Sequence, residues 1–365
     1  MRIVSKLWLQ LTVYLGLVTA VICLGIIFAA LAQDSAVADQ IALKRDVVPA
    51  SAAHFEALLA DNRPAAASLI AVGDIMLGRN VESLMQKKGT NYPFAAMNEV
   101  LTSADLAIAN LEGPVVSNHQ QTPDDSLSFS FPSESGDVLH ENGLSFLTVA
   151  NNHMLNHGLA GLVETRTLLE KSGVAPFGDP LSNSIEYVLK KNIDGLEFVL
   201  VGWNATQSAF SESASLETLD EISRESPDAF VVITVHWGLE YSPRSNARQQ
   251  QLARDWIDHG ANLVIGHHPH VTQEIEVYDG SLIVYSLGNF IFDQYFFPEA
   301  EIGLALLASF SDTGVVYTLL PFQSRNSQPS LMNSPDRDQW LDALTHKSPT
   351  VSPSAIRSGS IKLDY

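Results

Sequence analysis

The 365-residue sequence predicts an α/β fold, and three observations support this class. Short apolar runs alternate with amphipathic segments between residues 68 and 323, as strands and helices do when they follow one another. Hydrophobic residues make up 46% of the chain, enough to bury a sizeable core. Six of the apolar runs end in polar residues of ligand type, and open α/β sheets bind ligands at this edge.

The N-terminal segment 8–32 is almost wholly apolar and long enough to cross a bilayer as one helix. Arg2 and Lys6 precede it and no basic residue follows until Lys44, so we expect residues 1–7 in the cytoplasm and the remainder outside. The small residues Ala30 and Ala32 leave a second interpretation open, a cleaved signal peptide and a secreted domain. Either interpretation exports the domain.

Residues 33–67 are rich in Ala and Asp and predict a linker between the membrane and the domain. The single cysteine, Cys23, lies in the apolar segment, which excludes a disulfide framework and a catalytic thiol elsewhere. The 41 acidic and 21 basic side chains give a net charge of −20, so we expect no nucleic-acid partner. The same charge disfavours simple attraction to other polyanions.

The organised region, 68–323, begins at the first strand after the linker. We expect strands at 69–72, 106–109, 146–150, 198–201, 230–235, 262–265 and 282–286, followed by an antiparallel pair at 304–310 and 315–320. We expect helices at 81–87, 94–101, 159–172 and 247–259. Segment 117–130 is a long polar loop near the strand ends, and its length makes it functional or mobile. Residues 324–365 are rich in Ser, Pro and Asn and predict an extended tail.

The polar residues at the strand ends are carboxylates, amides and imidazoles. Taken singly, each has a structural interpretation: Asp74 could cap a helix, Asn152 could form a turn and His236 could be a core imidazole. Six such clusters at one edge of one sheet would instead assemble a metal site. They are Gly73-Asp74, Asn110-Leu111-Glu112-Gly113, Asn151-Asn152-His153, His236-Trp237-Gly238-Leu239-Glu240, Gly266-His267-His268-Pro269-His270 and Gly288-Asn289-Phe290.

In the fifth cluster, His268 and His270 alternate and are expected to point the same way, whereas His267 is expected to face away and play no role. The sequence has no Gly-x-Ser-x-Gly elbow, no Walker-type loop and no dinucleotide fingerprint after a strand. Serine-nucleophile and nucleotide chemistry therefore lack support. Mixed oxygen and imidazole ligands suit one or two divalent ions, with Mn, Fe or Zn favoured.

These clusters resemble, in order and over 69–293, the motifs of the CapA (PgsA-like) poly-γ-glutamate capsule proteins, a branch of the calcineurin-like metallophosphatase superfamily. The resemblance implies an α/β fold with a metallophosphatase-like layered β-sandwich flanked by helices, and a metal site at the strand ends. It implies that Asp74 and His270 bind a first metal, that Glu112 bridges, and that Asn152, His236 and His268 bind a second. It also implies that His153, in its protonated form, is the general acid. Four further residues are candidates for contacting substrate or orienting the ligands: Arg79, Asn110, Glu240 and Asn289.

The sequence departs from the wider superfamily at two positions. Met76 stands where an Asp-x-His motif has its histidine, and Glu112 stands where an aspartate is usual. A thioether is a poor ligand for a hard ion, so the number of metals stays open between one and two.

Two functions follow from the resemblance. One is a membrane-anchored, metal-dependent hydrolase or transferase acting on phosphoester, amide or glutamyl bonds of an anionic polymer or phosphoester substrate. The other is a non-catalytic assembly or export component of a capsule polymer machine, with a vestigial metal site. In both, other capsule-synthesis membrane subunits are candidate partners.

Overall fold

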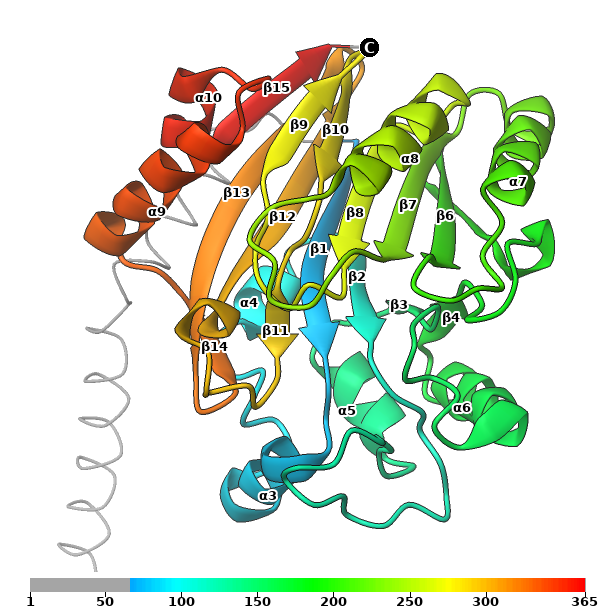
Figure 1. Ribbon diagram of the computed structural model, residues 1–365, viewed down its shortest axis with the longest axis vertical. Helices are drawn as coiled ribbons and strands as arrows, with labels where there is room; N and C mark the ends of the chain where they lie inside the picture. The colour runs from blue at the N-terminus through cyan, green and yellow to red at the C-terminus, as the bar shows by residue number, and fades with distance from the viewer. Residues whose placement is uncertain (1–65, 365) are drawn as a thin grey trace, which may run out of the picture. The chain divides into compact units, whose positions relative to one another are not determined.

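The computed structural model describes residues 66–364, and these form two β-sheets with helices around them (Figure 1). In spatial order, the first sheet contains β14 (Gln328–Leu331), β13 (Gly314–Arg325), β12 (Ile302–Ser311), β1 (Ala67–Ile75), β2 (Leu106–Leu111), β3 (Phe146–Thr148) and β4 (Ala175–Phe177). Two more strands join it, β11 (Asn289–Ile291) beside β1 and β15 (Ser360–Asp364) beside β13.

In spatial order, the second sheet contains β5 (Leu189–Ile193), β6 (Leu196–Asn204), β7 (Phe230–His236), β8 (Leu263–His267), β10 (Ser281–Val284) and β9 (Ile275–Tyr278). Strands β6, β7, β8 and β10 are parallel, and β5 and β9 are antiparallel edges. Strands β1, β2, β3, β4 and β11 of the first sheet are likewise parallel. Each sheet therefore has an edge at which several strands end together.

The two sheets pack face to face through one continuous apolar core. Leu69 and Ala71 of β1 lie in the same cluster as Leu200 of β6 and Ile265 of β8. The ring of Phe310 on β12 lies 5.0 Å from Phe198 and 4.8 Å from Phe230, centroid to centroid, in edge-to-face contacts. Strands covered on both faces are expected to be apolar throughout, which explains why these runs do not alternate.

The helices are α3 (Arg79–Lys88), α4 (Asn98–Leu101), α5 (Ser135–Glu141), α6 (Gly158–Lys171), α7 (Glu212–Glu225), α8 (Ala247–Asp258), α9 (Ser334–Lys347) and α10 (Pro353–Ser358), with 3₁₀ turns η1 (Ile185–Tyr187) and η2 (Pro298–Glu301). Helices α7 and α8 cover the outer face of the second sheet, where Ile222 and Trp256 pack against Val201 and Ile233. Helix α8 starts with a reciprocal capping box between Asn246 and Gln249.

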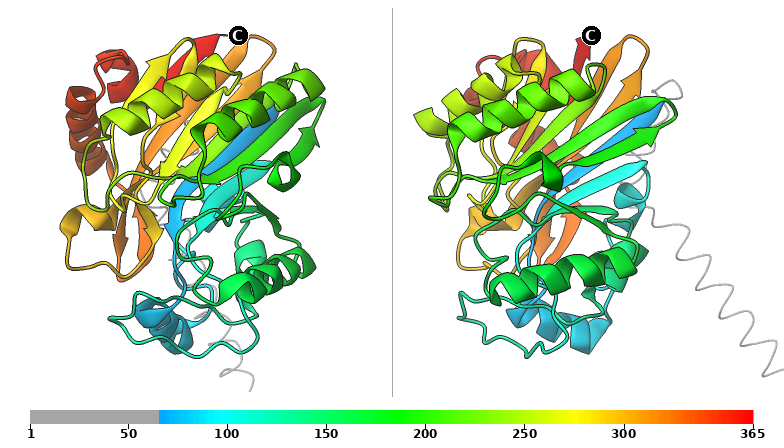
Figure 2. Two further views of the ribbon diagram at one scale, coloured as in Figure 1. Left: turned by 45° about the vertical axis from the view of Figure 1, so that its right-hand side comes forward. Right: turned by 90° about the vertical axis from the view of Figure 1, so that its right-hand side faces the viewer.

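The carboxyl ends of β1 and β2 point toward α3 and α6, which lie below the sheets in every view (Figure 2). The loops after β1, β2 and β3 of the first sheet meet those after β7 and β8 of the second there. The expectation that the six polar clusters share one edge of one sheet is therefore wrong. They belong to two sheets, because the chain crosses from β4 to the second sheet between the third and fourth clusters.

Strand β11 reaches β1 only because position 73 is glycine. A Cβ atom on Gly73 would lie 1.8 Å from the carbonyl oxygen of Gly288, the acceptor of the Asp74 N–H. The resulting parallel pairing places Asn289 opposite Asp74. Glycine at this position thus brings the sixth cluster to the first.

The expectation of an extended tail over 324–365 is wrong. This segment contains β14, α9, α10 and β15, and it lies beside β13 and β9 (Figure 1). Leu341, Leu344, Ile356 and Ile361 are buried in the core between the sheets. Polar residues surround these four in the sequence, so the sequence shows no clear apolar face. The four side chains nevertheless supply enough apolar surface to hold the segment in place.

The nine predicted strands are present, with shifted ends, and so are three of the predicted helices. Helix 94–101 is shorter than predicted, because residues 91–97 form successive turns and only Asn98–Leu101 is α-helical. Within 66–364 no helix has both the length and the apolar character to cross a bilayer. The predicted membrane segment 8–32 and nearly all of the predicted linker lie outside the described residues.

The buried C-terminal segment leads to a prediction about stability. Leu341→Ala should lower the free energy of unfolding by about 2–5 kcal/mol, because it removes a side chain that is 0% exposed from the core. Gln339→Ala, at an exposed position of the same helix, is the control and should change it by less than about 0.5 kcal/mol. Urea unfolding of the two variants measures the difference. Equal, small changes would show that the segment is not part of the cooperative core.

Candidate metal centre

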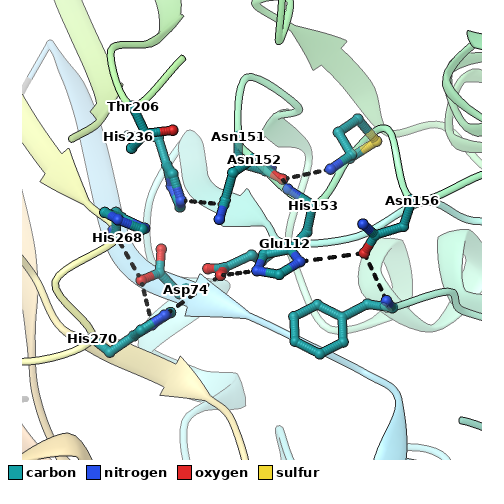
Figure 3. A network of polar contacts seen from close by, with 12 residues as sticks. Asp74, Glu112, Asn151, Asn152, His153, Asn156, Thr206, His236, His268 and His270 are labelled. Atoms are coloured by element: carbon teal, nitrogen blue, oxygen red, sulfur yellow. Dashed lines mark hydrogen bonds and ion pairs between the residues drawn. The ribbon is translucent and has the colours of Figure 1, made fainter. Parts of the chain in front are cut away.

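Asp74, in β1, is fully buried and contacts groups from both sheets (Figure 3). Its Oδ1 accepts a hydrogen bond from Asn110 Nδ2 at 2.8 Å, and its Oδ2 accepts one from the backbone N–H of His268 at 3.3 Å. His267 Nδ1 lies 3.1 Å from Oδ1, and His270 Nδ1 lies 3.4 Å from Oδ2. Burial alone would raise the pKa of Asp74, but the two imidazoles hold it well below its usual range. The carboxylate is therefore ionised at neutral pH.

Glu112 follows directly on β2, and its carboxylate faces the same space. Burial raises the pKa of Glu112 to about 8. Its Oε1 atom is buried and has no hydrogen-bond partner among residues 66–364. The nearest imidazole nitrogens are Nε2 of His270, at 3.6 Å, and Nε2 of His153, at 3.8 Å. An unpartnered buried carboxylate oxygen is costly unless another group binds it.

His236 ends β7 and joins the two sheets at the site. Its Nε2 lies 2.8 Å from Oδ1 of Asn152, and its Nδ1 lies 3.4 Å from Nδ2 of Asn110. Burial, with the nearby imidazole of His268, holds the pKa of His236 well below its usual range. The ring is therefore neutral, which is the form that binds metals.

His268 and His270 lie on the loop after β8, and both have backbone φ angles that are unusual for residues with a side chain. The angles are +92° at His268 and +59° at His270. Such strain is typical of functional loops whose side chains must be aimed. Burial lowers the pKa of His268 to about 4. Burial would also lower the pKa of His270, but Glu112 and Asp74 together raise it to about 9.

His267 was expected to face away from the site, and this expectation is wrong. It is the last residue of β8, so its side chain continues the inward face occupied by Ile265 and Leu263. It is 1% exposed and lies against Asp74. Alternation along β8 up to His267 predicts this direction. The strand ends at His267, and the backbone has positive φ angles at His268 and His270, so the alternation does not continue to those residues.

His153 projects from the loop after β3, and the side chain of Asn156 holds its ring. Its Nδ1 lies 3.3 Å from Asn156 Oδ1, which also accepts the backbone N–H of Phe129 at 2.7 Å. Since that oxygen is an acceptor, Nδ1 carries the proton and Nε2 presents a lone pair toward Glu112. Burial lowers the pKa of His153 to about 4, so the ring is neutral at pH 7. This differs from the protonated histidine that the resemblance implied.

Arg79, a candidate for contacting substrate, makes several contacts within the protein. It forms a buried ion pair with Asp293 and donates from Nη1 to the carbonyl oxygen of Ser126 at 3.1 Å. It also lies 5.0 Å from the ring centroid of Phe129 and 5.5 Å from that of Phe292. Arg79 therefore links loop 117–130 to Asp293.

The two candidate asparagines orient other side chains. Asn110 donates to Asp74, as described, and Asn289 Oδ1 lies 2.9 Å from Nδ1 of His270. The side-chain amide of Asn289 in turn donates to Gln294 Oε1 at 2.9 Å. These contacts fix the ring of His270, as partners of metal-binding histidines commonly do.

Two groups of three side chains could each hold a metal ion. Within each group the ligand atoms lie within 4.8 Å of one another. The groups are Asp74, Glu112 and His236, and Glu240, His268 and His270. The residues fit a divalent ion, because Glu112 Oε1 and His268 Nδ1 are buried without a hydrogen-bond partner in the described part of the chain.

Sequence reasoning missed three supporting residues. Asn151 donates to Asn110 Oδ1 at 3.0 Å and accepts the backbone N–H of His153 at 3.1 Å, so it ties the second cluster to the third. Asp293 pairs with Arg79, and the ring of Phe129 lies 4.2 Å from that of His153. Asn151 stands inside a quoted motif, but nothing in the sequence pairs Asp293 with Arg79.

Comparisons with known proteins place these motifs in a family. Residues 68–294 match the family described as "Bacterial capsule synthesis protein PGA_cap". The chain is 33% identical over 240 residues to the PGA biosynthesis protein CapA of Bacillus subtilis (strain 168), an alignment that covers 61% of this chain and 62% of that protein. It is 29% identical over 294 residues to the capsule biosynthesis protein CapA of Bacillus anthracis, covering 75% of this chain and 72% of that protein. A probable polyglutamine synthesis accessory protein of Mycobacterium tuberculosis is 21% identical over 288 residues, covering 63% and 75%.

The protonation of the site leads to a prediction about pH. His270, with a pKa raised to about 9, is charged at pH 7 in the metal-free chain and must lose its proton to bind a metal. The apparent affinity for Mn²⁺ should therefore rise between pH 7 and 9, by up to about tenfold per pH unit for each proton released. Calorimetric titrations at several pH values, in buffers of different ionisation enthalpy, measure both affinity and proton release. A flat affinity and a buffer-independent heat would contradict the prediction.

Proposed function

This chain belongs to the bacterial capsule synthesis protein family PGA_cap, and we propose that it acts in the synthesis or export of an anionic capsule polymer as a metal-dependent hydrolase. The relatives named for capsule and PGA biosynthesis support the polymer role. The observation that carries the hydrolytic role is the convergence of buried carboxylates and imidazoles around Glu112 Oε1.

The ligands in this proposal are those predicted from the sequence: Asp74, Glu112, Asn152, His236, His268 and His270. Bound divalent ions, Mn, Fe or Zn, would polarise a phosphoryl or acyl group and supply hydroxide at neutral pH. The protein's own contribution is to keep Asp74 ionised, to keep the rings of His236 and His268 neutral, and to exclude water from the carboxylates.

His153 is the residue that would move a proton. Its Nε2 faces Glu112 with a free lone pair, and the ring is held by Asn156 and packed against Phe129. In the metal-free chain the Nε2 atom of this neutral ring is a hydrogen-bond acceptor. An anionic substrate beside it would raise the pKa of His153, so that Nε2 could take a proton and pass it to a leaving oxygen.

A non-catalytic role in polymer assembly or export is the second candidate. The observation that favours it is the lowered pKa of His153, which leaves no acidic proton on this ring at neutral pH. Other membrane subunits of capsule synthesis would be the partners in this role. The net charge of −20 opposes direct binding of a polyanion, so metal ions would have to bridge the two.

The test of the hydrolytic role is turnover by His153→Gln. We expect the metal-loaded full-length chain to hydrolyse phosphoesters or poly-γ-glutamate, and the variant to keep its metal while kcat falls about 100-fold to 10,000-fold. Glu217→Gln, at an exposed position of α7, is the control and should match the wild type. Metal analysis and product assays are run on the same samples. Bound metal without turnover in the wild type would exclude the hydrolase and favour the assembly role.

We further propose that segment 8–32 anchors the chain, with residues 1–7 in the cytoplasm and the domain outside. The support is the apolar length and the basic residues that precede it. Protease added to intact cells stripped of their wall should then degrade the domain while a tag fused at the N-terminus stays protected. A released, shortened chain in the medium would show the cleaved signal peptide instead.

A further inference from the structure

Glu240 lies in the loop after β7. Backbone hydrogen bonds to the end of β8 and to the loop after it fix both ends of this loop. The N–H of Trp237 donates to the carbonyl oxygen of His267 at 3.1 Å, and the N–H of Tyr241 donates to that of Pro269 at 2.8 Å. The loop after β7 is thereby fastened to the loop after β8. Glu240 stands immediately before the second attachment, beside His268 and His270.

Two backbone features within the loop support this path. Gly238 has φ +81°, and a Cβ atom there would lie 2.8 Å from the side-chain amide of Gln249. Tyr241 has φ +58°, a left-handed conformation that is uncommon for a residue with a side chain. Gln249 is held by the capping box of α8 and by Gln273. The loop therefore packs tightly on α8.

The surroundings of Glu240 are those of a ligand. A carboxylate oxygen of Glu240 and one ring nitrogen each of His268 and His270 lie within 4.8 Å of one another. In tetrahedral coordination with bonds near 2.1 Å, donor atoms stand about 3.4 Å apart, so side-chain rotation would have to bring these atoms closer by at most about 1.4 Å. His268 Nδ1 is buried and lacks a hydrogen-bond partner among the residues described. Within the described chain no ion pair joins the Glu240 carboxylate to Lys, Arg or His at 4.0 Å or less.

Met76 is not positioned to act as a ligand of the same metal ion. It is fully buried, and its sulfur accepts the backbone N–H of Gly78 at 3.1 Å. The sulfur is thus directed at the start of α3, and a thioether is a weak ligand for a hard ion in any case.

We propose that Glu240 is a metal ligand, which together with His268 and His270 binds a divalent ion at the solvent-facing side of the site. The inference rests on the metal-binding part of the proposed function and not on hydrolysis. One carboxylate and two imidazoles form a donor set suited to Zn, Mn or Fe. Asp74, Glu112 and His236 would remain as the ligands of a second, buried ion.

Metal binding by Glu240→Gln tests the proposal. Glutamine keeps the shape of the side chain and removes its charge, and Glu240 is exposed, so the variant should fold as the wild type does. Mn²⁺ titrated into the metal-free full-length chain should bind with about two equivalents in the wild type. In the variant one equivalent should be lost or should bind at least about tenfold more weakly. Circular dichroism of the metal-free proteins checks the fold.

Two matched variants complete the experiment. Glu217→Gln makes the same chemical change at an exposed site on α7 and should bind Mn²⁺ as the wild type does. Glu240→His supplies a ring nitrogen and should restore binding of Co²⁺, with a visible absorption spectrum that differs from that of the wild type because one oxygen donor has become nitrogen. A spectrum identical in Glu240→Gln and the wild type would overturn the proposal.

The outcomes separate this inference from the proposed hydrolase. Unchanged stoichiometry and affinity in Glu240→Gln would overturn the assignment of Glu240 while leaving hydrolysis intact. Loss of one ion in that variant, in a chain that hydrolyses nothing, would support the assignment and exclude the hydrolase. A wild type that binds no Mn²⁺ or Co²⁺ at all would overturn both.

Discussion

The carboxylate of Asp74 is buried between two sheets, and the groups that contact it come from both of them. Asn110 reaches it from β2 of the same sheet, whereas His267, His270 and the N–H of His268 reach it from the end of β8. Removing one partner of a buried charge typically costs about 3–5 kcal/mol. The charge at Asp74 is therefore stable only when the carboxyl ends of the two sheets meet, so the site and the sandwich depend on one another.

This dependence explains features that look unrelated in the sequence. Gly73 permits the close approach of β11, which brings Asn289 to the ring of His270. The left-handed conformations of His268 and His270 turn the backbone after β8 so that a main-chain N–H and a ring both face Asp74. Local strain of this kind persists only where the surrounding structure over-determines it. Here the surrounding structure is the pair of sheets whose strand ends meet at the buried carboxylate.

Sequence patterns predicted the parts of the site that lie at strand ends. Apolar runs identify the strands, and only a few polar residues directly follow each run, so the candidate ligands are easily picked out. Asp74, Glu112 and His236 were found in this way, and the structure brings them together. The patterns failed where tertiary contacts decide. They assigned the clusters to one sheet, since periodicity does not say which strands pair. They also missed the burial of Leu341 and of the C-terminal segment, because a polar composition conceals a short apolar face.

The two ligand groups differ in exposure, and this difference decides how the site communicates with solvent. Asp74, Glu112 and His236 are all buried, whereas Glu240 is exposed. Next to Glu240, Leu239 is 67% exposed and Tyr241 contacts the ring of Phe296, which is 73% exposed. Exposed apolar side chains therefore border the site on the side of Glu240. The group that contains Glu240 is thus the more exposed of the two, and it contacts the buried group through His270, whose Nδ1 lies 3.4 Å from Oδ2 of Asp74.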